Sequence, residues 1–192
     1  MQEKIKKMLV ESADVKRKVA ENLSEEIESA AKMIILCFKS GGKLLIFGNG
    51  GSAADAQHFQ AELSHQFEIK RRKSLPAISL TTNTSVITAV GNDWGFDEVF
   101  ECQIEGLTKP GDVVFGITTS GNSENVIRAI NKAKLLGAKT IVLAGKDGGK
   151  IKEVADITIV VPSENTARIQ ESHLAIYHIL CHLIEQDLFG KK

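Results

Sequence analysis

Short apolar runs alternate with helix-like segments along most of this 192-residue sequence. Five runs have the length of a strand, and turn residues together with segments of helical apolar spacing separate most of them. They are residues 43–47, 75–80, 113–117, 140–144 and 157–161. Helices between successive strands make neighbouring strands parallel and cover both faces of the sheet. The sequence therefore predicts an α/β fold, with a five-stranded parallel sheet flanked by helices.

Helical segments account for most of the remaining sequence. The first forty residues have the apolar spacing of two helices, and Ser24, followed by two glutamates, resembles the N-cap of the second. Further helices are expected from the first strand's turn to residue 66, at 123–136 and at 166–188, with a helix or a turn at 86–90. No repeat or linker divides the sequence. We predict one domain over 1–192, with an N-terminal helical arm at 1–40 and an α/β core at 41–192.

Charge and cysteine content exclude several classes of protein. Basic and acidic residues both number 24, and this zero net charge argues against nucleic-acid or anionic-membrane partners. The basic run 70–73 is expected to form a solvated loop. The three cysteines lack CxxC spacing, which is typical of free thiols in a reducing compartment. No apolar signal core or membrane-length run occurs, so we expect a cytoplasmic protein.

The turn after the first strand has the composition of an anion-binding site. The segment Gly48-Asn49-Gly50-Gly51-Ser52-Ala53 opens a helix, whose first N–H groups favour a phosphate. It also fits the GxGxxG/A dinucleotide pattern, which needs an acidic residue about twenty positions on, at the end of the second strand. That strand ends in Leu80-Thr81-Thr82-Asn83, and Glu68 comes before it. We therefore expect no nucleotide cofactor.

A second turn, Thr118-Thr119-Ser120-Gly121-Asn122-Ser123, follows the third strand. It gathers four hydroxyls and an amide at the start of a helix, whereas an ordinary helix cap needs one hydroxyl. Both turns come at the carboxyl ends of parallel strands, where open α/β sheets bind their ligands. The sequence predicts a phosphate site here.

Acid, base and metal-ligand candidates lie on two predicted helices. His58 and Glu62 are four residues apart, so they share one face of the helix that follows the first turn. The last helix carries four candidates: Gln170, His173, His178 and His182. His178 and His182 are also four residues apart, and the pattern alone does not choose between this pair and the first.

Several motifs together resemble the phosphoheptose isomerases of the sugar isomerase (SIS) family. They are the two turns, residues 54–59, Gly91-Asn92-Asp93, residues 144–149 and Arg168-Ile169-Gln170-Glu171. The resemblance spans nearly the whole chain. It implies a flavodoxin-like or Rossmann-like three-layer SIS fold. It also implies a homotetramer with active sites between subunits, in which the N-terminal helical arm packs against other subunits. The implied reaction converts sedoheptulose 7-phosphate into D-glycero-D-manno-heptopyranose 7-phosphate, towards the heptose of lipopolysaccharide and related glycans.

The resemblance also assigns residues. Substrate contacts of the family match Asn49, Gly50, Gly51, Ser52, Asn92, Asp93, Thr118, Thr119, Ser120, Ser123 and Gln170. The ligands of the single zinc in each subunit of zinc-bearing members match His58, Glu62, Gln170 and His178. Glu62 and His178 also match the proposed catalytic base and acid. Where many members have Gly-Arg-aromatic, this chain has His65-Gln66-Phe67, and Ala167 stands where some have Asp.

The spacing of two implied ligands adds an inference. Gln170 and His178 are eight residues apart, which is about 12 Å along a helix and about 80° around it. Such a pair reaches one zinc from a single helix only in a stretched arrangement. Ligands from different subunits, or a helix that begins after Gln170, would relieve this. We predict a site completed across a subunit interface.

A non-enzymatic function is the main alternative. One SIS relative binds the bacterial replication initiator, and others sense sugar phosphates within regulators. The initiator-binding relative lacks matches to Glu62 and His178, which this chain has. The sequence therefore favours the isomerase, with a sugar-phosphate-dependent interaction protein as the alternative.

Overall fold

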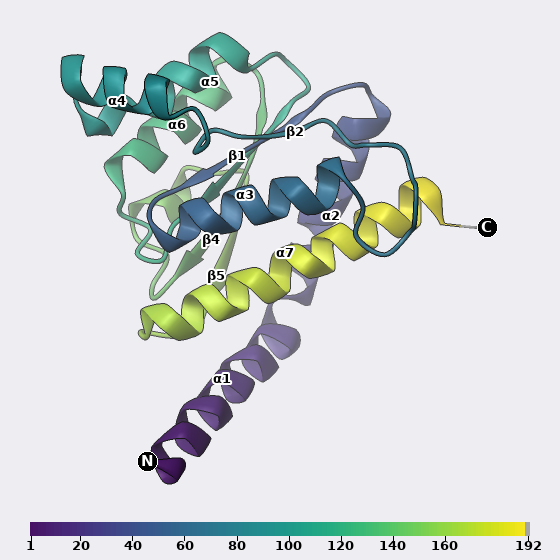
Figure 1. Ribbon diagram of the computed structural model, residues 1–192, viewed down its shortest axis with the longest axis vertical. Coiled ribbons are helices and arrows are strands. Elements are labelled where there is room, and N and C mark those ends of the chain that lie inside the picture. Colours follow the sequence, from purple (N-terminus) through teal and green to yellow (C-terminus); the bar gives the residue numbers. More distant parts are fainter. Residues whose placement is uncertain (191–192) are drawn as a thin grey trace.

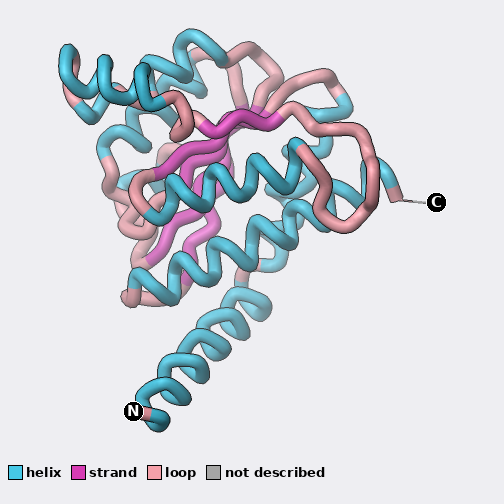
Figure 2. The backbone as a smooth tube through the Cα atoms, in the orientation of Figure 1, coloured by secondary structure: helices cyan, strands magenta, loops and turns pink. Residues whose placement is uncertain are grey.

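A five-stranded parallel sheet forms the centre of the molecule in the computed structural model, which describes residues 1–190 (Figures 1 and 2). Its strands are β1 (Leu44–Gly48), β2 (Ala77–Ser79), β3 (Val113–Ile117), β4 (Lys139–Gly145) and β5 (Ile157–Val161). They are ordered β2-β1-β3-β4-β5, and every neighbouring pair is parallel. This confirms the predicted fold class.

Seven α-helices and two 3₁₀ helices surround the sheet within residues 1–190. They are α1 (Gln2–Asn22), α2 (Ser24–Lys39), α3 (Gly51–Ser64), α4 (Thr84–Asp93), η1 (Phe96–Glu98), α5 (Glu101–Leu107), α6 (Glu124–Leu135), η2 (Lys150–Glu153) and α7 (Thr166–Phe189). Helix α1 extends away from the sheet, and α3 and α7 run side by side (Figure 1). Within the described part of the chain, no helix combines the length and apolarity needed to cross a membrane.

The two faces of the sheet carry separate cores because successive strand residues point to opposite sides. Leu44 and Ile46 of β1 pack in one core with apolar residues of α2, α3 and α7. Leu45 and Phe47 pack in the other core, with residues of α5 and α6. Burial on both faces explains why the strands read as continuous apolar runs in the sequence.

Several predicted boundaries are wrong for local reasons. Strand β2 covers three residues rather than 75–80, and it begins only at Ala77 because Pro76 has no N–H to donate to a neighbouring strand. Ser24 does not cap α2, because its hydroxyl donates to the Ala20 carbonyl of the preceding helix. Helix α4 begins at Thr84, two residues before the predicted start, with the Asn83 side chain accepting from the backbone N–H of Val86. Helix α5 was not predicted, because its seven residues are too few to show a helical period.

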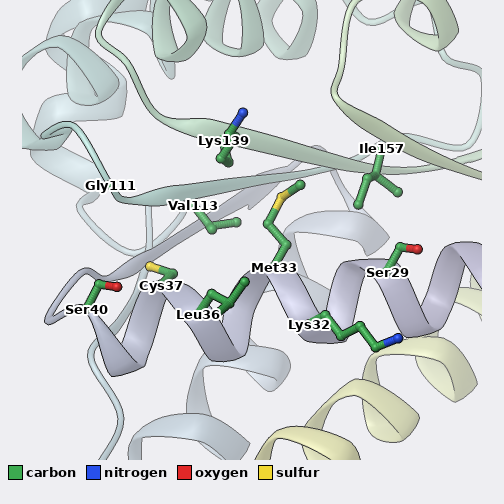
Figure 3. Close-up of a pocket in the computed structure, with 10 residues that line it drawn as sticks. All are labelled: Ser29, Lys32, Met33, Leu36, Cys37, Ser40, Gly111, Val113, Lys139 and Ile157. Atoms are coloured by element: carbon green, nitrogen blue, oxygen red, sulfur yellow. The ribbon is translucent and has the colours of Figure 1, made fainter.

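A cavity of about 540 Å³ opens between α2 and the amino ends of the strands (Figure 3). Its lining residues are Ser29, Lys32, Met33, Leu36, Cys37, Ser40, Gly111, Val113, Lys139 and Ile157. This described lining contains no carboxylate and no histidine, and it lies at the opposite edge of the sheet from the two predicted turns. The chemistry predicted from the sequence is therefore at the other edge.

Candidate active site

The two glycine-containing turns lie next to each other at the carboxyl edge of the sheet. Gly48 at the end of β1 is paired with Ile117 at the end of β3, so the turns that follow start from neighbouring positions. The side chains of Asn49 and Asn125 exchange two hydrogen bonds, of 2.8 and 3.0 Å, and thereby join the first turn to α6. Asn125 is buried and was missed in the sequence. Its position two residues after the hydroxyl-rich turn was the only signal.

The second turn has a fixed shape. The hydroxyls of Thr118 and Ser123 are 3.2 Å apart, and the Ser120 hydroxyl accepts from the backbone N–H of Asn122 at 3.2 Å. Gly121 has a φ of +67°, and a Cβ there would collide with the carbonyl group of Gly148. Only glycine fits this position. The loop after β4 therefore supports the turn from behind and leaves its hydroxyls at the sheet edge.

The side chain of Gln170, a residue of α7, contacts the beginning of α3. Its side-chain amide occupies the space that a Cβ on Gly51 would need, so the glycine permits α7 to approach the first turn of α3. Helix α7 begins at Thr166, and Gln170 is therefore inside it rather than before it. This places the Gln170 amide near the first of the two glycine-containing turns, residues 48–53 and 118–123, which we call the phosphate-type turns.

Three of the four implied zinc ligands come together further along α3. Potential ligand atoms of His58, Glu62 and His178 all lie within 4.8 Å of one another. His58 Nε2 is 3.1 Å from Glu62 Oε1. His178 Nε2 is buried and has no hydrogen-bond partner among residues 1–190. We call these three residues the His58 cluster.

Gln170 does not belong to the His58 cluster in this protomer. It contacts Gly51, which lies seven residues before His58, or about 10 Å along α3. Because α7 is continuous from Thr166, the predicted difficulty of joining Gln170 and His178 on one ion is present in the structure.

His178 is the histidine of α7 that faces α3. Burial and the neighbouring His58 lower the pKa of His178, while Glu62 opposes the shift. Its imidazole is therefore neutral at pH 7, with a lone pair available. His173 is fully buried with Nε2 2.9 Å from the Ala144 carbonyl, and burial lowers its pKa to about 4. His182 instead pairs with Glu68 at 2.8 Å on the surface.

Two residues lie behind His58. The Tyr177 hydroxyl is 2.9 Å from His58 Nδ1 and donates to Asp55 Oδ1 at 3.4 Å. Burial raises the pKa of Asp55, while the hydrogen bond from Tyr177 and the proximity of His58 act against the increase. Tyr177 was not among the predicted site residues, because a tyrosine at a helical core position is typical of packing.

A buried ion pair holds the end of α3. Glu185 of α7 accepts hydrogen bonds of 2.7–2.8 Å from the backbone N–H groups of residues 67–69, and pairs with Arg72. Arg72 also donates to the backbone carbonyls of Glu62 and Leu63. Both charged side chains are 1% exposed, so the prediction of a solvated loop at 70–73 is wrong for Arg72. Its partner is 113 residues away and left no local signal.

Asn92 and Asp93 lie apart from the other candidates. They are exposed at the end of α4, where the Asn92 amide donates to the Asp93 carboxylate at 2.7 Å. In Figure 1, α4 lies at the opposite side of the molecule from α7. Within one protomer, these two residues therefore do not join the His58 cluster.

The donor set of the His58 cluster fits a zinc ion. Zinc binds imidazole nitrogen and carboxylate oxygen, and its catalytic sites have three protein ligands with one open position. Two imidazoles and one carboxylate meet here, and one buried nitrogen has no other partner within the described residues. A neutral His178 next to the Glu62 carboxylate also gives this place two groups that can exchange protons with a substrate.

Comparison with known proteins gives consistent matches. The family model described as SIS domain matches residues 9–145. A phosphoheptose isomerase of Aquifex aeolicus is 54% identical over 186 residues, covering 97% of this chain and 97% of the relative. Solved phosphoheptose isomerases from Francisella tularensis and Neisseria gonorrhoeae superpose with TM-scores of 0.93 and 0.90, at 42% and 44% identity. Each structural match covers 96% of this chain and 98% of the other.

Proposed function

Since this chain belongs to the SIS domain family and, within it, to the phosphoheptose isomerases, we propose that it converts sedoheptulose 7-phosphate into D-glycero-D-manno-heptopyranose 7-phosphate. The observation that carries the proposal is the meeting of Glu62 and His178 on α3 and α7, the two helices that also bring Gln170 to the first of the two turns. The product would be the first precursor of the nucleotide-activated heptoses used for lipopolysaccharide or related glycans.

Ketose-to-aldose exchange moves a proton between two adjacent carbons through a cis-enediol. The reaction needs a base near C1, a group that exchanges a proton with the carbonyl oxygen, and stabilisation of negative charge. We assign the carbon proton to Glu62 and the oxygen proton to His178. The hydroxyls of Thr118 to Ser123 and the N-terminus of α6 would hold the phosphate without a net positive charge.

The His58 cluster would hold one zinc ion per subunit. Bound zinc would act as a Lewis acid on the sugar oxygens. A Glu62 carboxylate bound to a metal is a weaker base, so its two roles compete. Gln170 is the fourth implied ligand, and its position beside Gly51 supports a contribution from a different subunit.

A test of activity uses purified protein and sedoheptulose 7-phosphate. We expect an aldoheptose phosphate as product, with loss of turnover after chelation and recovery when zinc is added back. Product formation can be followed by nuclear magnetic resonance of the sugar. Tight binding of the phosphosugar without any conversion would instead support the interaction protein.

The site also implies an assembly, which we propose to be a homotetramer with active sites between subunits. Helix α1 leaves Ile5, Met8 and Leu9 exposed by 53–66%, a large apolar surface for an arm that projects from the molecule. Asn92, Asp93 and Gln170 are away from the His58 cluster in one protomer, and contributions from other subunits would account for that.

Dilution tests the assembly. We expect specific activity to fall as the protein dissociates, because a monomer lacks the residues that other subunits supply. Sedimentation or mass photometry would give the oligomeric state at each concentration. Full activity in a sample shown to be monomeric would contradict a site completed across an interface.

A further inference from the structure

Tyr177 occupies the space directly behind the His58 cluster. It is the only tyrosine of the chain and is fully buried between α3 and α7. Its ring stacks on Phe59, with centroids 5.4 Å apart and planes at 23°. The rings of His58 and His178 meet it edge-on, at 5.5 and 5.0 Å. The packing fixes the phenol ring and therefore the position of its oxygen.

The hydrogen bonds of this hydroxyl have a defined direction. An ionised carboxylate only accepts, so the single O–H of Tyr177 is donated to Asp55. The phenol oxygen then accepts the 2.9 Å hydrogen bond from His58, whose proton is placed on Nδ1. His58 Nε2 is left with a lone pair.

That lone pair faces another acceptor. His58 Nε2 lies 3.1 Å from Glu62 Oε1, and two acceptors at this separation repel each other unless a proton or a metal ion lies between them. The buried Nε2 of His178, without a partner among residues 1–190, is the third atom of the same group. The three atoms therefore present electron pairs to one position.

We propose that Tyr177, backed by Asp55, is a positioning residue that fixes the tautomer and ring orientation of His58 so that Nε2 binds the zinc ion. This proposal rests on the zinc site of the proposed function. Metal-binding histidines commonly donate their second N–H to a fixed acceptor, and loss of that acceptor weakens metal binding. Tyr177 and His178 are consecutive residues of α7, so one helix both orients one ligand and supplies another.

The direct test is zinc affinity of Tyr177→Phe, measured by competition with a chromogenic chelator. This change keeps the ring stack and removes only the hydroxyl. We expect zinc to bind about 10- to 100-fold more weakly. The matched control is Ser172→Ala, which removes another buried hydroxyl of α7, one that donates to the Arg168 carbonyl. It should bind zinc like the wild type.

A second readout requires no zinc. In the metal-free protein at alkaline pH, ¹⁵N resonances of the imidazole should show the Nδ1–H tautomer of His58, assigned with His58→Gln. In Tyr177→Phe, His58 should change to the Nε2–H tautomer, because that proton can then be donated to Glu62. A role of Tyr177 in packing alone predicts no tautomer change.

The outcomes separate this inference from the zinc proposal. If the wild type binds zinc and Tyr177→Phe binds it equally well, without a tautomer change, the positioning role is wrong. If the wild type binds no zinc, the zinc site itself fails and the inference fails with it. If Tyr177→Phe does not fold, Asp55→Leu decides, because leucine has no acceptor for the Tyr177 hydroxyl, and unchanged zinc affinity in that variant rejects the role.

Discussion

Glu62→Gln is expected to lower kcat by about 100- to 10,000-fold, the usual contribution of a positioned acid or base. Glutamine keeps the size of the side chain, but its amide does not take a proton from carbon. Steady-state kinetics with sedoheptulose 7-phosphate gives the loss, and calorimetric titration shows whether the substrate still binds.

Two measurements make this result specific. Glu68→Gln is the matched control, because it makes the same change at an exposed carboxylate that pairs with His182 on the surface. It should leave kcat unchanged. Zinc content of Glu62→Gln separates the two roles, since a base that is not a ligand can be replaced without losing metal. Near-normal isomerisation by Glu62→Gln with intact substrate binding would reject Glu62 as the base.

Glu185→Ala is expected to lower the free energy of unfolding by about 3–5 kcal/mol, as for one partner removed from a buried ion pair. The change leaves the Arg72 guanidinium buried without its carboxylate, together with three backbone N–H groups of residues 67–69. Urea unfolding measures the loss. Asp187→Ala on the same helix breaks an exposed pair with Lys39 and should cost less than about 1 kcal/mol.

The same carboxylate gives the stability a pH dependence. Burial pushes the pKa of Glu185 upward, but the N–H groups of Phe67 and Ile69 and the Arg72 guanidinium outweigh it, so the pKa lies below the ordinary 4.5. The stabilisation is complete above the ordinary value and is lost as pH falls below it and through the lowered pKa. Wild type should therefore lose more stability than Glu185→Ala between neutral pH and strongly acidic pH. Equal acid sensitivity would contradict the role of this pair.

The sequence predicted the parts of the site that depend on local spacing. His58 and Glu62 lie on one face of α3 because four residues make about one helical turn. In the structure, His58 Nε2 is 3.1 Å from Glu62 Oε1. The two turns were visible because each follows an apolar run directly. The sheet was predicted for the same reason, since strands buried on both faces leave continuous apolar segments.

The residues that were missed act through partners distant in sequence. Asn125 meets Asn49 across 76 residues, and Tyr177 meets His58 across 119. Arg72 was misjudged because its basic neighbours suggested a solvated loop, and nothing near it indicates the carboxylate of Glu185. Such pairs depend on which elements become neighbours in the folded sheet, and the local spacing of residues carries no signal of it.

Helix α7 is the last helix of the described chain and follows all five strands in sequence. During synthesis, the complete sheet emerges from the ribosome before residues 166–189 do. Until then α3 has neither His178 to complete the His58 cluster nor Glu185 to fix its far end. One face of the sheet also lacks the core residues of α7 until then, so that face and the His58 cluster are completed in the same step.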